Sequence, residues 1–303
     1  MFGCARAFDI YSLAKNGIPR AMNFLPLAHM FGLGTVLTVT FLGKLSLFLR
    51  SYGIELKSLL GGEVGFWQGK VDKIGDDFRD FRPTLLCIVP RLLNKLYDAV
   101  RVEIRKKGIL GRILFRLAVK GKLALIRRGD FEQNTLWDKL LFRKVRQRFG
   151  GQVCRVISSS APLSVEVCEF ARAAFSCFMI EAYGQTECVI GCWQTVNDID
   201  SGETGIPTSF NHIKLIDVPE KDYYARNRVG EICLRSPAVF SGYLKDEAKT
   251  KEVMDDDGWL HTGDIGRWTP KNTLQIIDRK KNMYKVRGRD FVPTRKCPCL
   301  FFS

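Results

Sequence analysis

The five residues Tyr183–Glu187 combine an aromatic ring, a glycine, a hydroxyl group and a carboxylate directly after a short apolar run. An aromatic ring can stack on a base, and a glycine lets a ligand approach the backbone. The hydroxyl of Thr186 can donate to a phosphate, and the carboxylate of Glu187 can hold Mg²⁺. Turns that follow buried strands are where α/β proteins bind nucleotide phosphates. A Tyr-Gly turn is also common as a plain turn, so this segment alone leaves both interpretations open.

Two later segments place further polar groups beside strand-like runs. Gly258–Asp264 ends in a carboxylate that can accept hydrogen bonds from both hydroxyls of a ribose, or can instead close an Asx turn. Ile276–Asn282 carries three consecutive cations after an apolar run, and such a charge run is often only a solvated linker. Each of these segments is ambiguous by itself.

The elements that must position these segments alternate along the first part of the chain. Short apolar runs predict buried strands at 84–89, 153–157 and 178–182, and helical periods predict helices at 70–81 and 91–106. Ser164 has the side chain and the position to cap a further helix. This alternation predicts an α/β domain with a largely parallel core sheet.

The second part of the chain is rich in strand-like runs separated by turn clusters. Strands are expected at 211–217, 229–235 and 273–277. This pattern predicts a smaller antiparallel or barrel-like subdomain attached to the α/β core.

The composition is that of a globular protein, with 303 residues of which 46% are hydrophobic and 26% charged. This much apolar surface can offset the entropy of ordering the chain, which excludes disorder as an overall description. No fixed-period repeat is present, which excludes solenoids and propellers. The ten cysteines lie mostly in apolar runs without a C-x-x-C pair, so we expect reduced thiols and no zinc site.

One uncharged stretch, residues 21–43, has the length of a membrane span. It is interrupted by Asn23, Pro26 and His29, so we predict a buried strand, turn and helix there in place of a transmembrane span. Residues 1–20 mix charged residues into short apolar stretches, which argues against a secretory signal peptide.

The net charge of +15 is concentrated between Arg101 and Arg128, where ten cations stand against one acid, Glu103. Apolar residues recur in this segment at the spacing of one helix face, namely Leu110, Ile113, Leu114, Leu117 and Ala118. The segment is either the solvated face of a surface helix or a surface attracted to an anionic membrane or a polyphosphate ligand. No nucleic-acid-binding motif accompanies the charge, so nucleic acid is not an expected partner.

Taken together and in this order, the segments resemble the adenylate-forming superfamily, and the match is closest to long-chain acyl-CoA synthetases. The resemblance extends over residues 24–293 and rests on Leu25–Phe31, Val89–Asn94, Tyr183–Cys188, Gly242–Asp246, Gly258–Gly266 and Ile277–Lys281.

The resemblance implies a long-chain fatty acid–CoA ligase that works in two steps. The fatty carboxylate attacks the α-phosphate of ATP to give an acyl-adenylate and diphosphate, and CoA then displaces AMP. ATP/AMP and Mg²⁺ are the implied cofactors, CoA the co-substrate and a long-chain fatty acid the substrate. The implied location is the cytosolic face of membranes such as the endoplasmic reticulum.

The resemblance also assigns roles to individual residues. It implies that Tyr183 stacks on adenine, that Asp264 and Arg279 contact the ribose, and that Thr186 contacts the phosphate. The full implied cofactor-binding set is Tyr183, Gly184, Asp264, Arg279, Ser160, Ala161 and Pro162. The implied catalytic residues are Thr186, Glu187, which is also the metal ligand, and Lys281, which falls at the hinge of the family's small domain. His29 would lie near the acyl carboxylate, or would instead be a core histidine.

The sequence departs from the family pattern in three places. No Gly-rich phosphate loop ending in lysine occurs, the chain ends close to the hinge, and Ser159 and Ser160 stand where the family has glycine. We therefore expect an incomplete large domain of the adenylate-forming fold, with the C-terminal small domain largely missing. The expected divisions are an unaligned segment at 1–22, an AMP-binding large domain at 23–278 that lacks its N-terminal part, and a hinge with a truncated small domain at 279–303.

These departures predict weak or no ligase activity for this chain, because each missing group removes charge stabilisation from the transition state. The alternative function is a non-catalytic nucleotide-binding or membrane-docking remnant. A third possibility is a chain that barely folds because its core lacks the opening strands.

Overall fold

The computed structural model describes residues 19–39, 62–195, 198–285 and 291–293. The chain divides into two compact units, the first comprising Met1–Ala182 with Thr195–Gly202 and the second Tyr183–Gln194 with Glu203–Ser303. The predicted boundary near residue 22 falls close to the first described residues, and residues 286–290 and 294–303 of the predicted hinge segment lie outside them.

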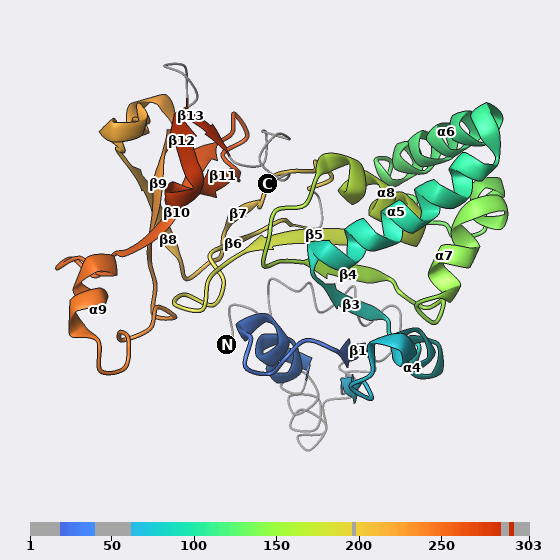
Figure 1. Ribbon diagram of the computed structural model, residues 1–303, viewed down its shortest axis with the longest axis horizontal. Coiled ribbons are helices and arrows are strands. Elements are labelled where there is room, and N and C mark those ends of the chain that lie inside the picture. Colours follow the sequence, from blue (N-terminus) through green and yellow to red (C-terminus); the bar gives the residue numbers. More distant parts are fainter. Residues whose placement is uncertain (1–18, 40–61, 196–197, 286–290, 294–303) are drawn as a thin grey trace, which may run out of the picture. The chain divides into compact units, whose positions relative to one another are not determined.

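A parallel sheet forms the centre of the first unit (Figure 1). Its strands follow the order β2-β1-β3-β4-β5, and each neighbouring pair is parallel. Their bounds are β1 Arg20–Asn23, β2 Glu63–Phe66, β3 Leu85–Ile88, β4 Arg155–Ser158 and β5 Phe178–Tyr183. Three of these strands lie where the apolar runs predicted them, so the predicted α/β core is confirmed.

Helices connect the strands. They are a helix at 30–39, η1 Val71–Lys73, α4 Ile74–Phe81, α5 Pro90–Lys106, α6 Gly108–Ile126, the π-helix η2 Asp138–Phe142, α7 Arg143–Gln147 and α8 Val165–Phe175. Ser164 caps α8 as predicted, because its side chain accepts a hydrogen bond from the Val167 backbone N–H at 3.3 Å. Pro90 begins α5, where its missing N–H costs nothing.

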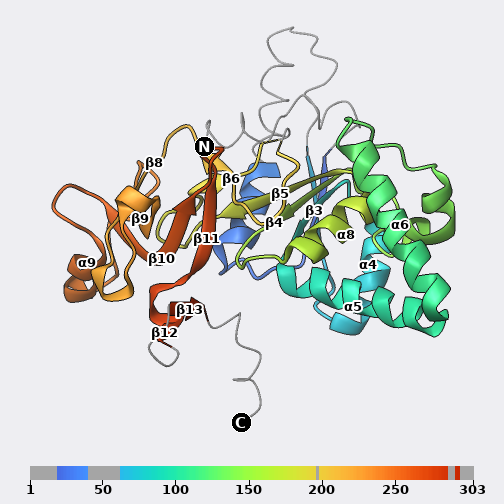
Figure 2. The ribbon, with the colours of Figure 1, turned by 90° about the horizontal axis from the view of Figure 1, so that it is seen from above.

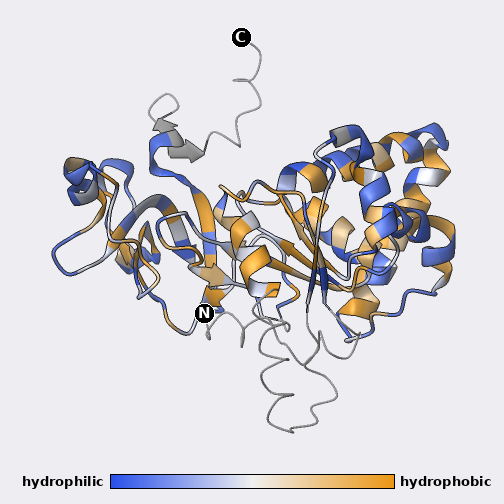
Figure 3. Cartoon of the chain, turned by 90° about the horizontal axis from the view of Figure 1, so that it is seen from below, coloured by the Kyte–Doolittle hydropathy of each residue, from blue (hydrophilic) through white to orange (hydrophobic). Residues whose placement is uncertain are grey.

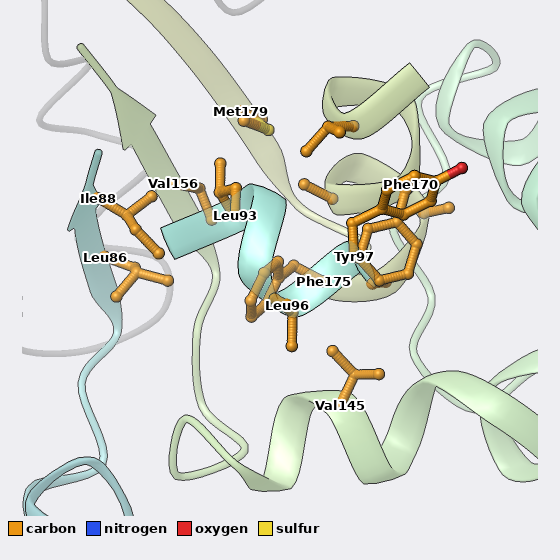
Figure 4. Packing of buried hydrophobic residues seen from close by; sticks show 14 of the residues in the cluster. Leu86, Ile88, Leu93, Leu96, Tyr97, Val145, Val156, Phe170, Phe175 and Met179 are labelled. Atoms are coloured by element: carbon orange, nitrogen blue, oxygen red, sulfur yellow. The ribbon is translucent and has the colours of Figure 1, made fainter. Parts of the chain in front are cut away.

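Both faces of the central strands β3 and β4 are buried. Leu86, Ile88 and Val156 pack against α5 and α8 in the main core, whose members Figure 4 shows around Leu93, Tyr97, Phe170 and Phe175. The alternate residues Leu85, Cys87 and Ile157 face the other way and form a second cluster with Phe31 and Val39 of the helix at 30–39. This alternation explains the continuous apolar runs in the sequence, since a strand covered on both faces needs apolar residues at every position.

The stretch at 20–39 forms β1, a turn and the helix at 30–39, which confirms the predicted strand, turn and helix up to residue 39. Residues 40–43 of the predicted stretch lie outside the described residues. Of the helices that the structure describes, none combines the length and the apolar character that crossing a membrane requires.

The second unit is antiparallel (Figure 2). Its main sheet has the order β11-β10-β9-β8, which confirms the predicted antiparallel subdomain. The strands are β6 Cys192–Trp193, β7 Ile206–Pro207, β8 His212–Ile216, β9 Val229–Arg235, β10 Leu260–Trp268, β11 Leu274–Arg279, β12 Met283–Lys285 and β13 Phe291–Pro293. The helices are η3 Pro219–Lys221, η4 Ala225–Asn227, α9 Glu247–Val253 and η5 Lys280–Asn282.

The basic segment 101–128 is not one helix but the end of α5 and all of α6, which meet at Lys107 and Gly108. Eight of its ten cations are exposed. Lys122 is an exception to the expected surface, because it is fully buried and forms an ion pair with Asp138 at 2.8 Å.

Candidate nucleotide-binding site

Asp264 occupies an irregular point of β10. The register of β10 against β9 shifts between His261 and Ile265, and its register against β11 shifts between Ile265 and Gly266. Asp264 is therefore a strand residue next to a bulge, and the alternative of an Asx turn is wrong. Across the ladder its partner is Arg279, the last residue of β11, whose Nε lies 3.4 Å from Asp264 Oδ1.

Tyr183 and Gln185 meet the same carboxylate. The Tyr183 hydroxyl donates to Asp264 Oδ2 at 2.9 Å, and Gln185 Nε2 donates to the same oxygen at 2.6 Å. Gln185 also donates to the Thr262 carbonyl oxygen at 2.9 Å, which ties the two segments together. Three segments that lie far apart in the sequence thus converge on one carboxylate.

Asp264 is only 5% exposed, and this burial has the largest effect on the pKa of its carboxyl group. Burial raises its pKa, the donors Tyr183 and Gln185 and the Arg279 cation lower it, and the nearby Asp278 carboxylate raises it, so that the pKa lies above its usual value. Oδ2 of Asp278 is buried without a hydrogen-bond partner in the described part of the chain. Burial also holds the pKa of Tyr183 well above its usual value, so its hydroxyl remains a donor.

Tyr183 and Gly184 each have a structural task besides any contact with a ligand. Tyr183 is 8% exposed and packs with Cys192, Ile232 and Leu274, so a base can contact only the small part that stays exposed. A Cβ added to Gly184 would lie 2.3 Å from the Val189 carbonyl oxygen, which shows that the turn itself requires glycine there.

Thr186 is exposed and Glu187 half-buried. Glu187 Oε1 accepts a hydrogen bond from the Tyr243 hydroxyl at 2.7 Å, and the Glu187 carbonyl oxygen accepts from the Phe240 backbone N–H at 2.8 Å. Burial and this hydrogen bond raise the pKa of Tyr243 to about 12, which keeps its proton in place as a donor.

Glu187 suits one kind of metal site. Among the described residues no group of three or more histidine, cysteine or acidic side chains is placed to hold a metal ion. Mg²⁺ usually keeps several waters and binds one or two carboxylates together with substrate phosphates. A single carboxylate such as Glu187, oriented by Tyr243, fits that mode.

The remaining predicted site residues lie elsewhere. His29 is exposed, and its Nδ1 accepts from the Phe31 backbone N–H at 3.2 Å, so the alternative of a core histidine is wrong. Ser160, Ala161 and Pro162 form an exposed loop after β4. Ser160 has φ of 77°, a conformation that favours glycine. His29 and this loop belong to the first unit, and the cluster around Asp264 belongs to the second.

Lys281 is exposed at the start of the predicted hinge, whereas its neighbour Lys280 is not a solvated linker residue. Lys280 Nζ lies 3.1 Å from Glu231 Oε2 and 3.3 Å from Glu220 Oε1. Burial lowers the pKa of Lys280, but the two carboxylates outweigh it and raise the pKa above its usual value.

Sequence reasoning missed the roles of Gln185 and Tyr243. Gln185 lies inside the segment Tyr183–Glu187, but that local pattern does not indicate that its amide binds Asp264. Tyr243 stood in the matched segment Gly242–Asp246, but its contact with Glu187 spans 56 residues and follows from no local pattern.

The parallel core and the antiparallel sheet that carries Asp264 define an adenylate-forming fold. The chain is similar to the adenylation domain of a carboxylate reductase from Mycobacterium chelonae, with a TM-score of 0.66 and 24% identity over 91% of this chain and 36% of that one. It is also similar to ATP-bound MatB from Rhodopseudomonas palustris, with a TM-score of 0.60 and 21% identity over 96% of this chain and 46% of that one.

The family described as "AMP-binding enzyme" matches residues 4–244, so the chain belongs to the AMP-binding enzyme family. Long-chain-fatty-acid–CoA ligase 5 of Rattus norvegicus is 44% identical over 276 residues, and long-chain-fatty-acid–CoA ligase 1 of Homo sapiens is 42% identical over 277. Both alignments cover 91% of this chain, which spans 38% and 37% of the length of these relatives.

Proposed function

We propose that this chain forms the ribose- and phosphate-contacting part of a long-chain fatty acid–CoA ligase. The reaction joins a long-chain fatty acid to CoA and converts ATP to AMP and diphosphate. The observation that carries the proposal is the convergence of Tyr183, Gln185 and Arg279 on the buried carboxylate of Asp264. The names of the relatives supply the substrate class.

Asp264 is the proposed acceptor for the ribose hydroxyls. Its pKa is raised above the usual value, so its negative charge is poorly compensated by the protein, and an added donor would stabilise it. Arg279 is 67% exposed and lies beside the other carboxylate oxygen, which suits it to a second contact with the sugar.

The reaction then needs positioning and charge neutralisation, not a covalent protein intermediate. In the first step an oxygen of the fatty carboxylate bonds to the α-phosphorus of ATP and the bond to diphosphate breaks. In the second step the CoA thiolate sulfur bonds to the acyl carbon, the bond from that carbon to the phosphate oxygen of AMP breaks, and AMP leaves. Bound Mg²⁺ would neutralise phosphate charge during the first step.

The other proposed assignments follow the family motifs. Tyr183 and Gly184 would border the adenine, and Thr186 would donate to the phosphate. The resemblance assigns Ser160, Ala161 and Pro162, which belong to the first unit, to the nucleotide as well. Glu187 would hold Mg²⁺, Lys281 would lie at the hinge, and His29 would lie near the acyl carboxylate.

Binding of adenosine, measured by calorimetry on the purified chain, tests the ribose site without the charge of a phosphate. Asp264→Asn keeps the shape of the side chain but removes its charge, so we expect affinity to fall at least tenfold, because hydrogen bonds to charged groups are the strong ones. The matched control is Asp256→Asn, which changes an exposed aspartate of the same unit and should leave affinity unchanged. Equal affinity of the wild type and Asp264→Asn for adenosine would contradict the proposed ribose contact.

Fatty-acid-dependent exchange of diphosphate into ATP tests the ligase chemistry. The expected exchange is slow, which stays a prediction from the sequence. Adenosine binding without any exchange would favour the alternative, a nucleotide-binding protein without turnover.

The basic segment 101–128 supports a second proposal, contact with an anionic membrane surface at the cytosolic face of a membrane. Its exposed cations carry this proposal, since each cation near an anionic surface strengthens binding and the effect weakens with salt.

A further inference from the structure

One face of α6 exposes a row of large apolar side chains. Ile109 and Leu110 are each 68% exposed, Ile113 is 49%, Leu114 42% and Leu117 50% exposed. Side chains three or four positions apart stand on the same face of a helix, so these five form one continuous surface, which we call the α6 apolar row.

The α6 apolar row is not the face that holds the helix to the protein. A different set at the same spacing is buried against the first unit, namely Gly111, Phe115, Ala118, Lys122 and Ile126. Phe115 contacts the ring of Phe170 on α8 with centroids 6.0 Å apart. The α6 apolar row is thus not part of the packed core. Figure 3 shows hydrophobic and hydrophilic positions interleaved on the helices of this unit.

Cations border the α6 apolar row along its length. Arg112, Arg116 and Lys120 are exposed, and each of the first two directly precedes a member of the row. Further exposed cations stand before and after the helix, at Arg105, Lys106, Lys107, Arg127 and Arg128. The one acid of the segment, Glu103, lies 3.5 Å from Lys106 and is therefore already paired.

We propose that α6 lies in the interface of an anionic membrane, with the α6 apolar row entering the boundary between headgroups and acyl chains. A helix with exposed apolar residues bordered by Lys and Arg suits that position. A second copy of this chain would bring the same cations against these cations, so charge favours lipid phosphates as the occupant. The inference deepens the proposed membrane contact, because it adds insertion to electrostatic attraction, and it is independent of the nucleotide site.

Flotation with lipid vesicles tests insertion. Vesicles of phosphatidylcholine with about 30% phosphatidylserine are compared with pure phosphatidylcholine. Binding is measured at about 0.1 M and about 1 M salt, since the Debye length falls from about 10 Å to about 3 Å between them. The wild type should bind the anionic vesicles and retain a measurable bound fraction at high salt, whereas electrostatic attraction alone would leave none.

Two variants separate the two contributions. Ile113→Ser with Leu114→Ser and Leu117→Ser should lose the salt-resistant fraction and bind at least tenfold more weakly. Arg112→Gln with Arg116→Gln and Lys120→Gln should weaken binding at low salt by about five-fold per cation. Each change replaces an exposed side chain, and cooperative thermal unfolding verifies that each variant folds.

The matched controls remove similar groups elsewhere. Leu136→Ser with Leu140→Ser removes two leucines that are 66% and 58% exposed. Lys95→Gln with Lys245→Gln and Lys251→Gln removes three exposed cations. Both controls should bind vesicles as the wild type does.

Several results would overturn the proposal. They are absence of wild-type binding to anionic vesicles, equal binding to neutral ones, complete loss of binding at high salt, or unchanged binding by the serine variant. A serine variant that alters the oligomeric state without lipid, and binds vesicles normally, would show that the α6 apolar row contacts protein. Adenosine affinity is measured in parallel, so failure of the nucleotide site is detected separately.

Discussion

Asp138 in the first unit and Asp264 in the second are both buried, with 1% and 5% exposure. They differ in how many positive charges lie beside the carboxylate. Asp138 accepts from Lys122 Nζ at 2.8 Å, from Arg146 Nη1 at 2.6 Å and from the Thr135 hydroxyl at 2.6 Å. Asp264 accepts mainly from the neutral donors Tyr183 and Gln185, and its cation Arg279 is largely exposed.

The pKa values differ accordingly. Burial raises the pKa of Asp138, but the hydrogen bonds from Lys122, Thr135 and Arg146 outweigh it and lower the pKa below its usual value. At Asp264 burial and the neighbouring Asp278 prevail, and the pKa is raised. The comparison teaches that a buried carboxylate with complete ionic partners is structural, whereas one left short of positive charge is suited to a ligand.

The largest expected effect is on folding at Asp138. Asp138→Ala leaves Lys122 and Arg146 buried without their carboxylate, so the free energy of unfolding should fall by about 3–5 kcal/mol. Urea denaturation measures the change, and Asp98→Ala, at an exposed position of α5, is the control. A loss below about 1 kcal/mol would contradict the structural role of this ion cluster.

Asp264→Asn should behave differently. It removes a poorly compensated buried charge and keeps the side-chain shape, so the free energy of unfolding should change by less than about 1 kcal/mol. The same urea measurement applies. If the free energy of unfolding falls as much as in Asp138→Ala, Asp264 is a structural residue and the proposed difference between the two sites is wrong.

The two carboxylates should also respond oppositely to pH. A raised folded-state pKa makes the ionised Asp264 unfavourable, so its contribution to stability falls as pH rises from about 3.9 through the raised value. The lowered pKa of Asp138 gives stability that is fully present above about pH 3.9 and is lost only below it.

As pH rises from about 4.5 to 7, the unfolding free energy of the wild type should therefore fall relative to that of Asp264→Asn. The difference between the wild type and Asp138→Asn should stay constant over the same range. Urea denaturation at several pH values measures both. Parallel curves for the two variants would contradict the assigned directions.

A small effect is expected at Tyr243→Phe. The change removes the hydroxyl that donates to Glu187 and should cost about 0.5–1.5 kcal/mol of unfolding free energy. Adenosine affinity should stay within about threefold of the wild type, because Tyr243 contacts the proposed metal ligand and not Asp264. A tenfold loss of adenosine affinity would show that Glu187 and Asp264 act as one site.

The local sequence pattern predicted the strands and the helix cap that form the core of the first unit. The strands at 84–89, 153–157 and 178–182 were predictable because burial on both faces demands unbroken apolar runs, and β3, β4 and β5 lie within or beside them. The cap at Ser164 was predictable because its side chain has one local task.

Other features depend on long-range contacts that no local pattern encodes. The pairing of Asp264 with Arg279 depends on the register of β10 and β11, which the bulge shifts. The burial of Lys122 depends on Asp138 in another element, so its charge alone suggested an exposed position. α6 is apolar on more than one face, so its sequence could not reveal which residues the core would cover.

The irregularities that flank Asp264 have a consequence for protein engineering. If a regular strand slides by one residue, every side chain moves to the opposite face of the sheet. The bulges of β10 fix its register against β9 and β11. Libraries that randomise exposed neighbours such as Arg267 should therefore leave the carboxylate where it is. A designer who wants to move it must first rebuild the backbone.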